Sequence, residues 1–223
     1  MKLTPHYRSN YPGEFVITES RWTHGHREQT REWVANPIEN HHISGRAACI
    51  GTSVDKYLFD YTILQRHRGG LLGSKKLQTY GTGEIAQQMR LDFTVENNQQ
   101  KLNELKEAEY QVNNIVYTTS RMVVSNPGEF YLIPHSPPLI NAALLIYLAA
   151  FDGHKEIYML GYNRDAPAGN SNWLKQVGAI ISAYAGTKFI LVGVEADQPA
   201  ELFTFPNVST IDYRPGFISQ CDV

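Results

Sequence analysis

Two apolar runs in this sequence each end in a glycine that is followed by small or polar residues. The run "RAACI" leads into Gly51, Thr52 and Ser53, and the run "EIYML" leads into Gly161, Tyr162 and Asn163. Glycine lets a ligand approach the backbone closely, and an asparagine amide both donates and accepts hydrogen bonds. A turn of small residues after a buried strand is also typical of a phosphate site. The two endings together predict a site for a phosphate-bearing ligand.

His135 and Ser136 precede a long apolar stretch that we interpret as a helix over 137–151. The free backbone N–H groups at the start of a helix can receive an anion. We therefore expect this start to form a second wall of the site that holds Gly161. Taken alone, Ser136 is explained as well by helix capping and Gly161 by the end of a strand.

A general base at this site must lie within reach of the proton that it removes, so position counts for more than residue type. Asp165 is the first candidate because it follows the strand end at Asn163 by two residues, and His135 is the second. His67 and Asp60 remain alternatives.

The segment 66–84 is rich in glycine and carries a cluster of cations, Arg66, Arg68, Lys75 and Lys76. Glycine-rich loops approach ligands closely or close over them, and clustered cations neutralise nucleic-acid phosphates. We predict that these four residues contact nucleic acid. A solvated surface loop is the alternative interpretation.

A metal site would need paired carboxylates, and the pair that stands at a predicted strand end is Glu195 and Asp197. Such a pair can hold Mg²⁺ or Mn²⁺ between phosphates, but ordinary surface acidity explains it more often. We expect no divalent metal to be required.

The elements that must position these residues alternate between strand and helix, which indicates a mostly parallel sheet with helices on both faces. Strands are predicted at 14–20, 46–51, 89–95, 112–120, 129–134, 156–163, 188–195 and 208–214, and helices at 54–68, 96–111, 137–151 and 171–186. Residues 26–37 are expected to form one or two helical turns, so 1–44 is either an arm or a first β-α unit. The whole chain, 1–223, is predicted to be one Rossmann-like α/β domain.

Composition limits the classes of function. The formal net charge of −2 gives no overall basic character that would indicate nucleic acid. Cys49 and Cys221 are far apart and indicate a reducing compartment rather than a disulfide scaffold. The N-terminal residues lack the apolar core of a signal peptide, and the apolar run 139–151 is too short to span a bilayer. We expect a cytoplasmic protein that does not enter membranes.

The segment "GHKEIYMLGYN", with the apolar helix before it, resembles the family 42 sialyltransferases and their bacterial relatives. In that family a strand ending in "GNGPSL" contacts the nucleotide, and here "ACIGTSVDK" occupies the equivalent place, with Gly51 and Ser53 matching. The resemblance covers about half of the chain. It implies a Rossmann-type, GT-A-like glycosyltransferase that uses a nucleotide sugar and no metal.

The departures from that family exclude its usual donor and base. Asn163 stands where the family has aspartate, Arg164 and Asp165 replace an aromatic pair, and no histidine follows in the next residues. CMP-sialic acid is therefore not expected, and a UDP-sugar is favoured.

The segment "LQRHRGGLLGSKKLQTYGTG" resembles segments of phage-encoded proteins, among them the arabinosyltransferases that glycosylate hydroxymethylcytosine in phage DNA. It implies transfer of a sugar, such as arabinose, to 5-hydroxymethylcytosine in DNA, in the host cytoplasm. Three alternatives stay open: a non-catalytic nucleotide- or nucleic-acid-binding module, a glycosyltransferase acting on a surface glycan, and a different enzyme on the same type of sheet. The oligomeric state is not predicted.

Overall fold

The fold is that of a computed structural model, which describes residues 1–8, 11, 14–35, 45–51, 77–163 and 172–211, with 14–20 and 28–35 described through their backbone. No helix in these ranges combines the length and the apolar character that a membrane span needs.

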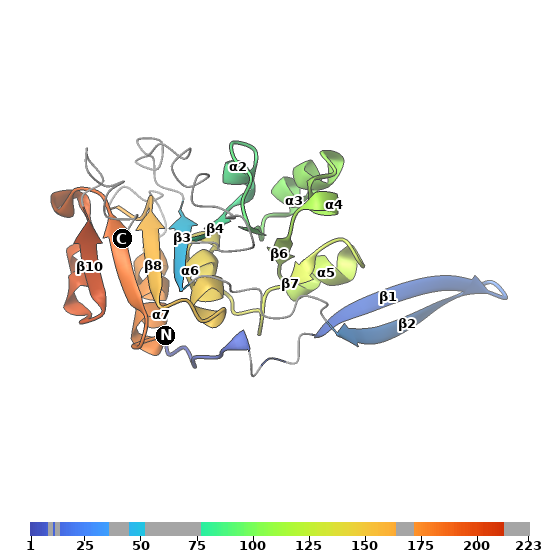
Figure 1. Cartoon of the computed structure of the whole chain (residues 1–223). Helices are drawn as coiled ribbons and strands as arrows, with labels where there is room; N and C mark the ends of the chain where they lie inside the picture. Colours follow the sequence, from blue (N-terminus) through green and yellow to red (C-terminus); the bar gives the residue numbers. More distant parts are fainter. Residues whose placement is uncertain (9–10, 12–13, 36–44, 52–76, 164–171, 212–223) are drawn as a thin grey trace.

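Within the described residues, eight strands form one sheet in which every neighbouring pair is parallel (Figure 1). Its spatial order is β10-β9-β8-β3-β4-β5-β6-β7. The strands are β3 (Arg46–Ile50), β4 (Gln78–Gly81), β5 (Phe93–Val95), β6 (Val116–Thr118), β7 (Tyr131–Leu132), β8 (Glu156–Leu160), β9 (Lys188–Val192) and β10 (Val208–Ile211). The predicted Rossmann-like α/β fold is confirmed.

The strand order reverses its direction between β3 and β8. From β3 the chain adds β4 to β7 on one side, and after β7 it crosses back through helix α6 (Asn141–Phe151) to place β8 on the other side of β3. In open parallel sheets such a switch leaves a crevice beyond the carboxyl ends of the two central strands. The fold therefore has its ligand-binding position at the ends of β3 and β8.

Helices pack on both faces of the sheet because each strand alternates its side chains between two apolar cores. Ala47 and Cys49 of β3 belong to the core under α6 and α7, whereas Ala48 and Ile50 belong to the core with α2 and α3. The other helical elements are α2 (Gly83–Ala86), α3 (Gln99–Glu107), α4 (Tyr110–Asn113), α5 (Ser120–Ser125), α7 (Asn172–Ala183), and the short turns η4 (Glu195–Asp197) and η5 (Ala200–Thr204).

The sulfur of Cys49 lies fully inside the protein. Its thiol donates to the Leu145 carbonyl oxygen at 3.6 Å, and burial raises its pKa well above the ordinary value. The Cys49 thiol is thus part of the core.

Residues 14–35 form a two-stranded antiparallel arm, β1 (Glu14–Thr23) with β2 (His26–Ala35), that extends beyond β7 (Figure 1). The strand predicted at 14–20 is confirmed, but the helical turns predicted at 26–37 are wrong. The turn residues explain why, since His24 and Gly25 both have positive φ, at 50° and 81°. This backbone joins antiparallel strands tightly, so the hairpin overrides a weak helical preference.

The loop predicted over 66–84 is wrong in its last part, because Gln78–Gly81 is a central strand and Gly83 begins α2. A Cβ on Gly81 would lie 2.7 Å from Cδ1 of Leu91, and one on Gly83 would lie 3.2 Å from a carboxylate oxygen of Glu96. These two glycines thus make room for neighbouring side chains of the core.

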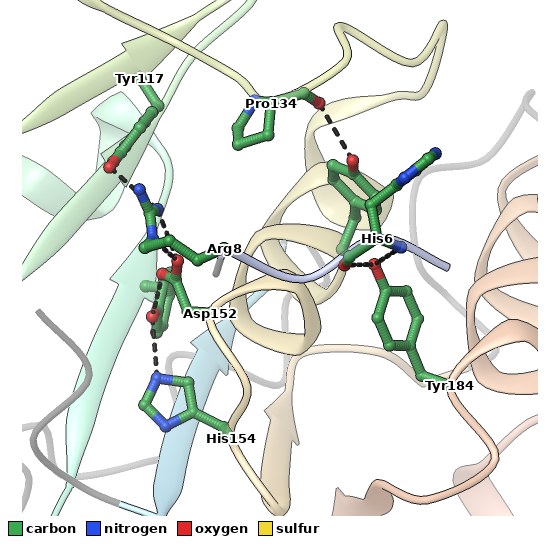
Figure 2. Close-up of polar contacts among 9 residues, drawn as sticks. His6, Arg8, Tyr117, Pro134, Asp152, His154 and Tyr184 are labelled. Carbon is green, nitrogen blue, oxygen red and sulfur yellow. Dashed lines mark hydrogen bonds and ion pairs between the residues drawn. The ribbon is translucent and has the colours of Figure 1, made fainter. Parts of the chain in front are cut away.

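The N-terminal segment is tied to the sheet by a buried polar network (Figure 2). Arg8 pairs with Asp152, directly after α6, at 2.5 Å and donates to the Tyr117 hydroxyl at 3.2 Å. Tyr80 donates to the other Asp152 oxygen at 2.7 Å and lies 2.8 Å from Nε2 of His154. A phenol has one O–H, so Nε2 of His154 carries the proton that completes this contact.

Charge balance keeps the Arg8–Asp152 pair ionised inside the protein. Burial acts to lower the pKa of Arg8, but Asp152 and Tyr117 outweigh it, and the pKa lies above its ordinary value. For Tyr80, burial and the neighbouring Asp152 carboxylate raise the pKa well above 10.0, so its hydroxyl remains a donor. The N-terminal segment is therefore held by a buried, hydrogen-bonded charge pair.

We predict that Asp152→Asn lowers the free energy of unfolding by about 3–5 kcal/mol, because it leaves the buried Arg8 charge without its counterion. Arg46→Ala is the matched control, since the Arg46–Glu156 pair is partly exposed and should contribute about 0–1 kcal/mol. Urea unfolding measures both. Equal losses for the two variants would show that the buried pair does not anchor the segment.

Candidate functional site

The crevice at the switch point begins with a backbone contact between the ends of β3 and β8. The Gly51 amide donates to the Leu160 carbonyl at 2.7 Å, and Gly161 follows with a φ of 73°. A Cβ on Gly51 would lie 2.7 Å from the Gly161 carbonyl oxygen and 2.8 Å from the Tyr162 ring. Glycine is therefore required at residue 51 for the two strand ends to meet.

Tyr162 links this contact to the start of α6. Its ring packs against Gly51, and its hydroxyl donates to the Ala142 carbonyl at 2.7 Å in the first turn of the helix. The ring is buried, which raises the pKa of the hydroxyl well above 10.0. Tyr162 thus connects the end of β8 to the start of α6. Asn163, which is 6% exposed, follows it at the same edge of the sheet.

A buried carboxylate fixes the start of α6 at the carboxyl edge. Glu96, directly after β5 and 2% exposed, accepts hydrogen bonds from the Asn141 amide at 2.6 Å, the Asn98 backbone at 2.9 Å and the Gly83 backbone at 3.3 Å. Oδ1 of Asn141 in turn accepts from the Asn97 backbone at 3.1 Å. Four elements are joined here, namely the end of β5 and the starts of α2, α3 and α6.

The first turn of α6 therefore faces the edge where β3 and β8 end. The N-cap residue of this helix, Ile140, offers no side-chain cap to the N–H groups that follow it. Uncapped N–H groups at a helix start carry partial positive charge and bind phosphate oxygens. The edge can chemically accept a diphosphate that lies over Gly51 and Gly161.

Sequence reasoning missed Glu96, Asn97 and Asn141. Glu96 and Asn97 directly follow the predicted strand "DFTV", just as Gly51 follows "RAACI". Asn141 stands three residues after Pro138, near the expected start of the helix. What the sequence does not reveal is their pairing, since Glu96 and Asn141 are 45 residues apart.

The expectation that His135 and Ser136 stand at the start of the helix is wrong. The helix begins at Asn141, and the His135 ring lies 3.9 Å from that of His6 and 6.2 Å from that of Phe151, the last residue of α6. Ser136 donates to the Ile133 carbonyl at 3.3 Å. Both residues thus lie beside the far end of a helix that is about 14 Å long from Ala142 to Phe151.

The physical reason is that the chain after β7 runs back along α6 before the helix starts. His135 and Ser136 have positive φ values of 57° and 38° and form the bend in this path. Packing of the two histidine rings explains the bend better than helix capping does. Burial and the neighbouring His6 lower the pKa of His135, which favours its neutral form.

The structure therefore brings together Gly51, Gly161, Tyr162 and Asn163, and separates His135 and Ser136 from them. The other predicted site residues lie outside the described ranges, and these are Thr52, Ser53, Asp60, Arg66, His67, Arg68, Lys75, Lys76 and Asp165. Glu195 and Asp197 form the exposed turn η4 after β9. Among the described residues, no three or more His, Cys, Asp and Glu side chains gather in a way that would hold a metal ion.

Two grooves in the described part of the chain lie away from the switch point. A polar groove of about 620 Å³ is lined by amide side chains, including Gln87 and Asn113, near the amino ends of β5 and β6. A second, of about 580 Å³, lies between α7 and η5. The second groove has Glu201 in the first turn of η5, and neither groove is lined by residues at the ends of β3 and β8.

Comparison with family models, with curated proteins and with solved structures yields no match for this chain.

We predict that Gly51→Ala lowers the free energy of unfolding by about 1–3 kcal/mol, because the added methyl group would lie 2.7 Å from the Gly161 carbonyl oxygen and force the two strand ends apart. Gly45→Ala is the control at the opposite end of β3, where an added Cβ meets nothing within 4 Å. Its effect should stay within about 0.5 kcal/mol. Urea unfolding of both variants is the measurement, and a Gly51→Ala protein as stable as the wild type would contradict the close contact of the strand ends.

Proposed function

We propose that this protein is a glycosyltransferase that transfers a sugar, a pentose such as arabinose, from a UDP-sugar to the hydroxyl of 5-hydroxymethylcytosine in DNA. The observation that carries the proposal is the contact between Gly51 and Gly161 at the topological switch, under the start of α6. Nucleotides bind at this position in open parallel sheets, and glycines there let phosphates approach the backbone.

The resemblance of "GHKEIYMLGYN" to Rossmann-type glycosyltransferases supports the choice of a nucleotide sugar, because this segment supplies β8 and the strand end at the switch. The cations at 66–76 support an acceptor that carries phosphates. The sugar and the DNA base are proposals from the sequence.

In the reaction, the bond between the sugar C1 and the diphosphate oxygen breaks while a bond forms from C1 to the acceptor oxygen. Backbone N–H groups after Gly51 and in the first turn of α6 would stabilise the negative charge on the leaving diphosphate. The acceptor hydroxyl loses its proton to a carboxylate, for which Asp165 is the candidate since it follows the β8 strand end. Glu96 is occupied by three donors and would hold α6 in place instead of acting as the base.

The test is incubation of the protein with hydroxymethylcytosine duplex DNA and UDP-arabinose or UDP-glucose, followed by mass analysis of the nucleosides. We expect the hydroxymethylcytosine nucleoside to gain the mass of one sugar, and cytosine DNA to gain none. Binding of DNA and nucleotide without any mass gain, whichever UDP-sugar is supplied, would favour a non-catalytic binding module.

A second experiment concerns the base. Asp165→Ala should lower the transfer rate by about 10²–10⁴-fold, the usual contribution of a general base. Asp197→Ala, an exposed carboxylate after the neighbouring strand β9, should retain full activity. Unchanged transfer by Asp165→Ala, at an unchanged melting temperature, would remove this residue from the mechanism.

A further inference from the structure

Thr82, the residue directly after β4, has a hydroxyl that the described part of the protein leaves without a hydrogen bond. The residue is 4% exposed and stands at the N-cap of α2, where a threonine usually bonds to the N–H groups of the first turn. Its side chain does not cap this helix, and it forms no hydrogen bond with any other described residue. A buried hydroxyl without a partner costs free energy, so its presence needs a reason beyond the stability of the fold.

The start of α2 is held by a different group. Gly83, the first residue of this helix, donates its N–H to Oε2 of Glu96 at 3.3 Å. The Glu96 carboxylate therefore anchors the helix start from the end of β5. The Thr82 hydroxyl takes no part in this anchor and remains available to a ligand.

Thr82 borders the crevice at the switch point. Strands β3 and β4 are parallel, and the last pair in their register is Ile50 with Gly81. One residue further along each strand, Thr82 stands level with Gly51, at the spacing of neighbouring strands, which is about 4.8 Å. Figure 1 shows β4 beside β3, with α2 at the same edge of the sheet.

The direction of the Thr82 side chain follows from the alternation along β4. Tyr80 belongs to the core under α6, whereas a Cβ on Gly81 would meet Leu91 in the core on the other face. The backbone at Thr82 is still extended, with a φ of −84° and a ψ of 172°, so its side chain is directed to the α6 face. Because Glu96 fixes the start of α6 at this edge, the hydroxyl lies on the same side of the sheet as that helix start.

The carboxylate beside Thr82 favours a ligand group that is neutral and can donate a hydrogen bond. Oε1 of Glu96 accepts from Asn98 and Asn141, but among the described residues Oε2 accepts from Gly83 alone. A carboxylate oxygen has room for a second donor, and its negative charge repels a phosphate. An alcohol hydroxyl on the ligand satisfies both neighbours, because it can accept from Thr82 and donate at the same time.

We propose that Thr82 binds a ribose hydroxyl of the nucleotide whose diphosphate lies over Gly51 and Gly161. This inference rests on the proposed function, which supplies the nucleotide, and it places the ribose on the β4 side of the crevice. The ribose is joined directly to the diphosphate, which agrees with a site only one strand away from Gly51. Thr82 then distinguishes ribonucleotides from nucleotides that lack these hydroxyls.

The test is isothermal titration calorimetry of the whole protein with UDP and with 2′,3′-dideoxy-UDP. Thr82→Val keeps the shape of the side chain without its hydroxyl, and it should weaken UDP binding about tenfold, the effect of one hydrogen bond. Dideoxy-UDP should bind equally to Thr82→Val and to the wild type, because neither complex has this bond. Thr82→Ser restores the hydroxyl and should bind UDP as the wild type does.

Thr118→Val is the matched control. Thr118 is fully buried, its Oγ1 has no hydrogen-bond partner in the protein, and it ends β6, two strands away from β4. Its replacement should leave the affinity for UDP unchanged. Without nucleotide, neither valine variant should lower the melting temperature, because each removes a hydroxyl that the fold does not use.

Equal weakening of UDP and dideoxy-UDP by Thr82→Val would overturn the inference, and so would a lower melting temperature at an unchanged UDP affinity. A wild-type protein that does not bind UDP would contradict both the inference and the proposed donor. The expected loss in Thr82→Val without sugar transfer from any donor would uphold the ribose site while the proposed function fails. Sugar transfer with an unaltered UDP affinity in Thr82→Val would have the opposite meaning.

Discussion

The complete burial of helix α6 is the constraint on which the rest of the structure depends. Every residue of the helix from Ala142 to Phe151 is buried. The helix must therefore lie between the sheet and α7, and it cannot face water on any side. This position forces the chain to return from β7 across the sheet and to add β8 next to β3. The switch point, the contact between Gly51 and Gly161, and the orientation of the helix start toward the site all follow from that return.

An apolar helix in an apolar core has little to fix its position along its own axis, since hydrophobic packing is not directional. Polar bonds at the two ends supply that direction here. Asn141 pairs with Glu96 at the start, and Asp152 pairs with Arg8 and Tyr80 at the end. The N-terminal segment that leads into the arm is thereby connected, through one rigid helix, to the edge where the proposed chemistry takes place.

Much of the fold was predictable from the sequence because its signals are local. Apolar runs that end in glycine marked β3 and β8, and the alternation after residue 112 marked the later strands and helices. The strand Gln78–Gly81 was missed because its residues are mostly polar, and it becomes buried only through its place in the middle of the sheet, between β3 and β5. The Asn141–Glu96 and Arg8–Asp152 pairs join residues 45 and 144 positions apart, and no local pattern reports such contacts. His135 was misplaced because a helix preceded by prolines was assumed to begin at the first of them.

Amide hydrogen exchange with and without UDP-arabinose tests the central claim most directly, namely that the crevice between β3 and β8 holds a nucleotide sugar. The account predicts slower exchange at Gly51, at residues 161–163 and in the first turn of α6, with the groove near Gln87 unchanged. Protection confined to that groove, or no protection at the ends of β3 and β8, would contradict it.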